Sequence, residues 1–108
     1  MVSRIWHGWT TFANAPVYER LLLSEILPGI AAKHLPGYHG AHVLRCNLED
    51  EVEFLTVLWF DSLDGVRALA GEEYEAAYVP PNARAVLARF DATSQHYETV
   101  LTPRTNPV

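Results

Sequence analysis

The chain has 108 residues, a formal net charge of −5 and a hydrophobic fraction of 49%, which fit one globular domain with a single core. The negative charge argues against nucleic-acid binding, and no apolar run is long enough to cross a membrane. The N-terminus lacks the apolar stretch of a signal peptide, and the single cysteine, Cys46, cannot form a disulfide within the chain, so we expect a cytoplasmic protein.

The first predicted element is a strand over residues 3–11. Trp, Ile and Thr are prominent in it, and both of its faces carry a large ring: Trp6 on one face, His7 and Trp9 on the other. Bulky rings on both faces are typical of a strand that is covered on both sides. We therefore expect this strand in the interior of a sheet.

A helix is predicted from Ala15 onward, with Asn14 as its N-cap. Its apolar face repeats every fourth residue over residues 18–26. Pro28-Gly29 is expected to kink or interrupt the helix, since proline cannot donate a backbone hydrogen bond and glycine is conformationally loose.

Two further strands, over residues 38–48 and 52–60, flank the acidic turn 49–51 and form a predicted hairpin. After Leu55 the second of these strands carries no charge on either face until Asp61. A strand that is apolar on both faces is covered on both sides. Because so short a chain supplies helices for one face only, we expect a partner subunit on the other.

The last part of the chain predicts a helix over residues 62–70, capped by Ser62, and a further strand over residues 94–102. Between them we expect a helical turn near residues 73–78 and a short helix over residues 82–87. The tail, residues 103–108, is expected to fray.

The order of elements is β-α-β-β-α-β. With right-handed crossovers this order gives the ferredoxin-like α+β fold, in which the first and third strands are central in an antiparallel four-stranded sheet. The same two strands carry apolar residues on both faces. Pattern and topology therefore agree on a single domain over residues 1–108, with a core over about residues 3–101.

Several segments resemble the antibiotic biosynthesis monooxygenase-like (ABM) domain of the dimeric α+β barrel superfamily. They are Leu58-Trp59-Phe60-Asp61-Ser62-Leu63, the helix after Asn14 with Tyr18, Leu21 and Leu22, the segment from Tyr74 to Tyr78, and the closing His96-Tyr97-Glu98. The resemblance implies a homodimer in which two sheets pack face to face into a barrel. It also implies a pocket between each sheet and its own helices.

Two activities are known in that family. Some members oxidise polycyclic aromatic polyketides with O₂ and without metal or flavin; others degrade heme with an Asn on strand one, a Trp late in strand three and a His on the next helix. Here Phe60 stands at the position of that Trp, and Trp59, one residue away, faces the opposite side. Residues 3–11 contain no Asn, and Tyr78 is the nearest match to the His. The sequence therefore argues against heme degradation.

The resemblance implies where a substrate would bind. Phe54, Leu58 and Phe60 are expected to face the helices and form the pocket floor, together with Thr56. Trp9 is a candidate to stack on an aromatic ring. Such a pocket suits a small, flat aromatic molecule.

His7 and His96 are the candidate general bases, because an imidazole titrates near neutrality and accepts a proton without a large pKa shift. They lie on the first and last strands, which are neighbours in this topology. Tyr78 is a candidate to hydrogen-bond a substrate hydroxyl or carbonyl.

Leu55, Val57 and Trp59 alternate with the pocket residues, so they are expected to face away from the helices and form the dimer interface. His39 and His42 stand three residues apart in a strand and point to opposite faces, so they cannot share a metal ion. We expect no metal site and no bound cofactor.

The favoured function is a cofactor-independent monooxygenase that acts on a small aromatic or polyketide-like substrate. An isomerase or cyclase on the same scaffold is an alternative, because acid–base residues in an apolar pocket serve either reaction. A small-molecule-binding dimer without catalytic activity is the remaining alternative, which a pocket without titratable side chains would favour.

Overall fold

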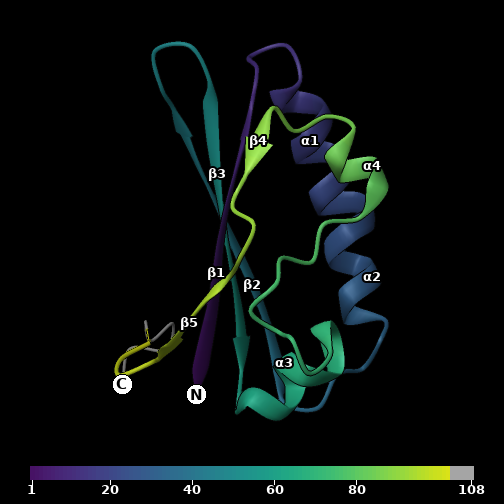
Figure 1. The fold of residues 1–108 in the computed structure, drawn as a ribbon, viewed down its shortest axis with the longest axis vertical. Helices are drawn as coiled ribbons and strands as arrows, with labels where there is room; N and C mark the ends of the chain where they lie inside the picture. The colour runs from purple at the N-terminus through teal and green to yellow at the C-terminus, as the bar shows by residue number, and fades with distance from the viewer. Residues whose placement is uncertain (103–108) are drawn as a thin grey trace, which may run out of the picture.

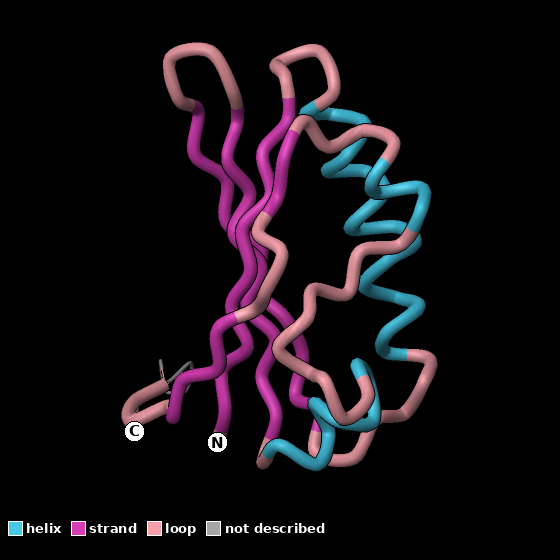
Figure 2. Tube along the Cα trace, in the orientation of Figure 1, coloured by secondary structure: helices cyan, strands magenta, loops and turns pink. Residues whose placement is uncertain are grey.

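The protein folds as one antiparallel sheet with all its helices on one side, as shown by a computed structural model that describes residues 1–102 (Figures 1 and 2). The tail expected to fray, residues 103–108, lies outside the described residues. In chain order the elements are β1 (Val2–Thr10), α1 (Ala15–Leu21), the π-helical segment η1 (Leu22–Ile26), α2 (Leu27–Ala31), β2 (Tyr38–Asn47), β3 (Val52–Phe60), α3 (Leu63–Ala70), α4 (Pro81–Arg84), β4 (Arg89–Phe90) and β5 (Gln95–Glu98).

The strand order is β2-β3-β1-β4, and β5 also pairs with β1. β1 and β3 pair along their whole length, from Val2 opposite Phe60 to Thr10 opposite Val52. The predicted ferredoxin-like α+β fold is therefore confirmed, with β1 and β3 at the centre. The fourth strand differs from the prediction, because it is split into two short strands that pair with opposite ends of β1.

The first helix continues through Pro28, where the sequence predicts a kink or a break. Helix α1 passes into η1, whose π-helical bonding gives way to α2 one residue before the proline. A wider π turn rearranges the carbonyls that the proline ring would meet, and the missing N–H of Pro28 falls in the first turn of α2. The change in helix type replaces the expected interruption.

In the second half of the chain, one helix begins as predicted and two segments differ from the prediction. Ser62 caps α3, and its Oγ accepts a hydrogen bond from the backbone N–H of Asp64 at 3.3 Å. Residues 73–75 form a turn rather than a helix, Ala76 pairs with Thr93 in an isolated bridge, and residues 77–78 are irregular. The short helix begins at Pro81 instead of residue 82, since Pro is favoured in a first helical turn.

The two faces of β3 differ in burial. Val52, Phe54, Thr56, Leu58 and Phe60 face the helices, and each is buried. The intervening residues of the strand are only half-buried. This alternation is what a strand shows when one face is covered by the chain's own helices and the other is not. Two clusters of buried residues fill the covered side, one at each end of the sheet.

Candidate functional site

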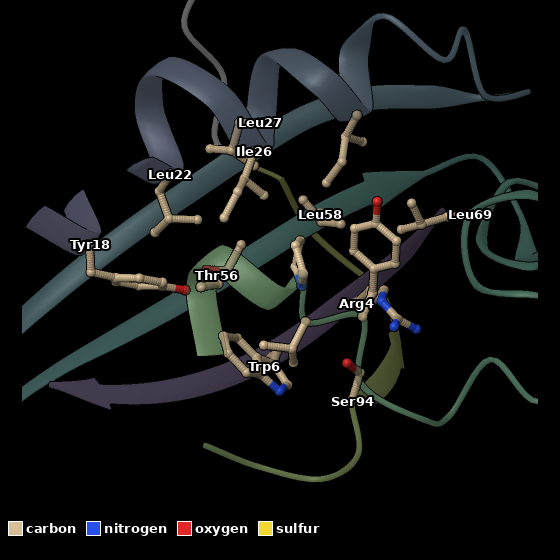
Figure 3. A pocket seen from close by; sticks show the side chains of 15 residues that line it. Arg4, Trp6, Tyr18, Leu22, Ile26, Leu27, Thr56, Leu58, Leu69 and Ser94 are labelled. Atoms are coloured by element: carbon tan, nitrogen blue, oxygen red, sulfur yellow. The ribbon is translucent and has the colours of Figure 1, made fainter. Parts of the chain in front are cut away.

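A cavity lies between the sheet and the helices, at the middle of the covered face (Figure 3). The space between its atoms is about 530 Å³, including solvent at its mouth, and the centre of a water molecule reaches only about 50 Å³ of it. The cavity is therefore narrow, and it is called the slot below. Its lining comes from the strands (Arg4, Trp6, Thr56, Leu58), from the helices (Tyr18, Leu22, Ile26, Leu27, Ile30, Leu69, Ala83), and from Tyr78, Val79, Pro80 and Ser94.

Most of the lining is apolar, but a few polar side chains come to it from different elements. β1 contributes Arg4, α1 contributes Tyr18, β3 contributes Thr56, and the segments before α4 and β5 contribute Tyr78 and Ser94. An apolar cavity with a few polar groups is typical of a small-molecule site.

Arg4 is the most unusual of these residues, because its side chain is charged and only 3% exposed. Its Nη1 donates to the Tyr74 carbonyl at 2.5 Å and to His96 Nε2 at 2.9 Å, and its Nη2 donates to the Ala76 carbonyl at 3.2 Å. Burial lowers the pKa of the guanidinium, but arginine stays charged in proteins. Among residues 1–102, none of its hydrogen-bond partners carries a negative charge.

His96 lies beside Arg4 rather than in the cavity lining. Burial and the Arg4 charge lower the pKa of its imidazole, while Glu75 opposes them. The rings of His96 and Tyr74 pack edge to face, with their centroids 5.1 Å apart. The lone pair of His96 Nε2 accepts from Arg4, so the neutral imidazole holds the guanidinium in place.

Tyr18, from α1, and Thr56, from β3, are two hydroxyl-bearing residues of the cavity lining. Tyr18 is 1% exposed, and burial raises the pKa of its phenol, which keeps it a neutral hydrogen-bond donor. Thr56 Oγ1 is buried and has no hydrogen-bond partner within residues 1–102. A buried polar atom without a partner is rare and costly.

Tyr78 stands at the mouth of the cavity and is 40% exposed. It also borders a shallower groove next to the cavity, to which Glu25 and Lys33 contribute. Its phenol is thus placed where a ligand would enter.

The expected pocket floor is only partly present. Leu58 and Thr56 line the cavity, but Phe54 and Phe60 do not, since both are fully buried in the core on either side of it. Phe54 packs edge-on against Tyr18, and Phe60 against Tyr38. The structure therefore corrects the assignment of these two phenylalanines to the substrate site.

The structure does not bring His7 and Trp9 to the cavity. Both side chains alternate with Arg4 and Trp6 along β1, and so they lie on the face that the helices leave open. Their rings stack with centroids 5.9 Å apart, and His7 Nδ1 lies 2.9 Å from Asp91 Oδ2. A base at His7 would act on the opposite side of the sheet from this cavity.

The predicted interface residues, Leu55, Val57 and Trp59, lie on that same open face. Each is half-buried within the single chain, and the imidazole of His42 packs against the Trp59 ring with centroids 4.5 Å apart. Leu44, opposite Leu55, is 55% exposed. The open face is thus apolar at its centre and uncovered by the described chain.

Sequence reasoning missed Arg4, Trp6 and Tyr18 as residues of the site. One signal was present: Arg4 is a charged residue in a strand that the pattern places inside the sheet. A charge at a buried strand position calls for a partner or a ligand. Trp6 and Tyr18 carried no such signal, because rings on covered faces are usually core.

Within residues 1–102 no three His, Cys, Asp or Glu side chains are grouped so that they could hold a metal ion. The helices of this part of the chain are also too short or too polar to cross a membrane.

No protein-family model and no curated protein matches the sequence. Solved structures match the fold. The heme-degrader MhuD from Mycobacterium tuberculosis, with two hemes bound in its active site, is 20% identical with a TM-score of 0.57, over 96% of this chain and 100% of that chain. A Bacillus cereus protein provisionally assigned as an antibiotic biosynthesis monooxygenase is 12% identical with a TM-score of 0.58, over 99% of this chain and 97% of that chain.

The class that the fold defines is the α+β sandwich of ferredoxin-like topology. Within that class the chain has the fold of the ABM domain, as the sequence resemblance predicts.

Proposed function

We propose that this protein is a monooxygenase of the ABM type that oxidises a small aromatic or polyketide-like molecule without a bound cofactor. One observation carries the proposal: the fold encloses a narrow apolar slot in which Trp6 and Tyr18 offer rings and a few hydroxyl groups offer hydrogen bonds. A flat aromatic molecule fits a slot better than a globular one does. The same slot excludes most water from the reacting carbon.

The reaction is balanced without a cofactor when the substrate supplies the electrons. A CH₂ group between two aromatic rings and next to a carbonyl system loses a proton and gives a delocalised anion. O₂ takes electrons from that anion and forms a C–O bond as a hydroperoxide, which loses water. The net change converts CH₂ and O₂ to C=O and H₂O.

In this scheme the residues of the protein bind and orient the substrate. The neutral phenol of Tyr18 donates a hydrogen bond to the substrate oxygen that gains charge, as in other sites that stabilise a developing oxyanion. Tyr78, at the mouth, lies where the departing proton reaches water. His96 acts through Arg4 as a positioning residue.

A second candidate function is a binding protein without catalytic activity. It is favoured by one observation: within the described residues the cavity lining includes no carboxylate and no imidazole. A general base of ordinary strength is therefore missing from the cavity wall, and only a substrate with an acidic C–H would react.

Oxygen consumption with an anthrone tests the two candidates. The monooxygenase predicts one O₂ consumed per quinone formed, with a rate that Tyr18→Phe lowers about tenfold or more. The matched control is Tyr97→Phe, since Tyr97 is 53% exposed and outside the cavity lining. Binding without O₂ uptake supports the binding protein, and rearrangement without O₂ uptake supports an isomerase.

Heme is not the proposed substrate, although MhuD shares the fold. The cavity lining within residues 1–102 has no imidazole to bind the iron, and Phe60 occupies the position of the family's Trp in the core. Added hemin should give no stoichiometric Soret shift and no ring opening with reductant. Tight one-to-one binding followed by loss of the Soret band would contradict this.

We further propose that a second copy of the chain covers the open face of the sheet. Leu55, Val57 and Trp59 form an apolar strip there, and burying one such side chain contributes roughly 1.5–3 kcal/mol. The sheets of the two copies would then pack face to face, with their helices outward.

A further inference from the structure

The cavity holds a buried positive charge that no carboxylate of residues 1–102 neutralises. Arg4 lies on the helix-facing side of β1, opposite Leu58 on β3 and His96 on β5. It is 3% exposed, and most of the cavity wall is apolar. Taking an ion out of water into such surroundings costs several kcal/mol unless an opposite charge accompanies it.

The protein partners of Arg4 are all neutral. They are the carbonyls of Tyr74 and Ala76 and the Nε2 lone pair of His96. No carboxylate of residues 1–102 lies within 4.0 Å of its guanidinium, although other arginines of the chain form ion pairs. Holding the loop at Tyr74 and Ala76 would require only a neutral donor, so the fold alone does not account for the charge.

Arg4 also keeps free donors. A guanidinium has five N–H groups, and three of them are used by the partners above. The remaining two, on Nε and Nη2, have no partner within the described residues. Nε and Nη2 lie on one edge of the guanidinium, and arginine can bind two oxygens of an anion through this pair of nitrogens.

The charges around Arg4 do not compensate it. Burial and the Arg4 charge lower the pKa of His96, so its imidazole is neutral near pH 7. Arg67, whose guanidinium stacks on the Tyr74 ring at 5.4 Å, is already paired with Asp64. Glu75 acts on His96, but its side chain belongs to an exposed turn. Among residues 1–102, Arg4 is therefore the one charged side chain in the cavity lining.

Thr56 gives a second, independent indication of a ligand. Thr56 lines the cavity and is 9% exposed, and its Oγ1 is buried without a hydrogen-bond partner in residues 1–102. Such a hydroxyl both donates and accepts. An unused hydroxyl and an unused cationic edge in one narrow slot are complementary to a polar group on an otherwise apolar ligand.

We propose that the cavity binds its ligand as an aromatic oxyanion, a carboxylate or an ionised phenol on a ring system, whose negative charge pairs with Arg4 and whose oxygen accepts from Thr56. The apolar lining, with Trp6, holds the rings. This deepens the proposed function and uses the same cavity, but it concerns recognition and does not require O₂.

Two probes of equal shape test the charge. Binding of 2-naphthoate and its neutral isostere 2-naphthamide is measured by calorimetry on the full chain. A charge-assisted hydrogen bond contributes about 1.5–3 kcal/mol, so the acid should bind about tenfold or more tightly than the amide. Equal affinity for the two would overturn the proposal.

Two substitutions of Arg4 test whether the preference for the acid over the amide depends on this residue. Arg4→Met should bring the ratio of acid to amide affinity to about one, and Arg4→Lys should restore part of it, since lysine keeps the charge but not the planar fork. The control is Arg20→Met, which removes the same charge from an exposed position on α1. Retention of the preference in Arg4→Met would count against Arg4.

Substitutions of two threonines test whether the Thr56 hydroxyl binds the ligand. Thr56→Val should weaken 2-naphthoate binding about two- to tenfold, the usual effect of one hydrogen bond. Thr10→Val is a matched control, because Thr10 Oγ1 is also buried without a partner but lies outside the cavity lining. Equal loss in both variants would show an effect on folding rather than on the ligand.

An ionised phenol is distinguished from a carboxylate with 4-nitrophenol, whose anion is yellow. Bound to the native protein it should ionise at lower pH than in water, because Arg4 favours the anion. If Arg4→Met does not fold, this shift and the naphthoate preference of the native protein decide the question. An anion preference without O₂ uptake would leave this inference standing while the proposed monooxygenase fails.

Discussion

The two faces of the central strands carry similar apolar residues but have different surroundings. On the helix side, Phe54, Leu58 and Phe60 are at most 6% exposed within the single chain. On the other side, Leu55, Val57 and Trp59 are half-buried, with no element of the described chain above them. The helix side is complete as it stands, and it encloses the cavity.

The two strand histidines show what this difference does to chemistry. His96, on the helix side, loses solvent and faces a cation, and the pKa of its imidazole is lowered. His7, on the open side, lies between the carboxylates of Asp91 and Glu53. The two histidines, on neighbouring strands, thus have opposite electrostatic surroundings: a cation beside His96 and carboxylates beside His7.

The largest expected effect concerns the open face. Trp59→Glu places a charge at the centre of the proposed interface and should convert a dimer to monomer or aggregate, as measured by sedimentation equilibrium. Leu23→Glu is the control, because Leu23 is 56% exposed on the outer side of the helical layer. A native protein that sediments as a monomer at micromolar concentration would contradict the assignment of this face.

The next comparison separates the two histidines by activity. His96→Ala removes the group that holds Arg4 and should lower kcat/KM for quinone formation by about 10²-fold, the effect of a misplaced binding group. His7→Ala should leave kcat/KM unchanged, because His7 lies on the opposite face of the sheet. The reverse result would place the chemistry on the open face.

A smaller effect distinguishes a closely packed glycine position from an open one. In α3 a Cβ at Gly65 would collide with the Pro36 carbonyl and the Phe60 ring, so Gly65→Ala should lower the free energy of unfolding by about 1–3 kcal/mol. In α2 a Cβ at Gly29 meets nothing within 4 Å. Gly29→Ala should therefore stabilise the protein by up to about 1 kcal/mol. Urea denaturation of both variants measures the contrast.

The smallest expected effect is the pH dependence due to His96. Its folded pKa lies below the unfolded value of 6.5, so the unfolded chain binds more protons between these two pKa values. Stability from this group is complete above the unfolded pKa and is lost as the pH falls through the folded one. The melting temperature of the native protein should fall more steeply on acidification than that of His96→Gln. Parallel curves would mean that the imidazole is not held neutral by Arg4.

The fold was predictable because its signals are local. Ser62 as a helix cap, the hairpin turn at residues 49–51 and the alternation along residues 52–60 depend on neighbours in the chain. The path of the helix through Pro28 was not predictable, because the effect of the proline depends on a π turn that helix propensities do not show. The division of the last strand depends on which ends of β1 remain unpaired.

The site was predictable only as a region. The sequence placed Leu58 and Tyr78 near a pocket between sheet and helices, and both line the cavity. It also placed Phe54 and Phe60 there, although a helix-facing ring is equally suited to fill the core. Whether a ring lines or fills a space depends on the volume left by distant side chains, such as Tyr18 and Tyr38.

By itself the sequence determined the order of the elements, the central position of β1 and β3, and the side of β3 that each residue faces, because periodicity fixes direction along a strand. Only the tertiary structure decided which side chains meet. It joined Arg4 to His96 and to the turn at Tyr74, segments far apart in the chain, and gave that cation no countercharge from residues 1–102. Burial and charge compensation are sums over all neighbours in space, which no local pattern contains.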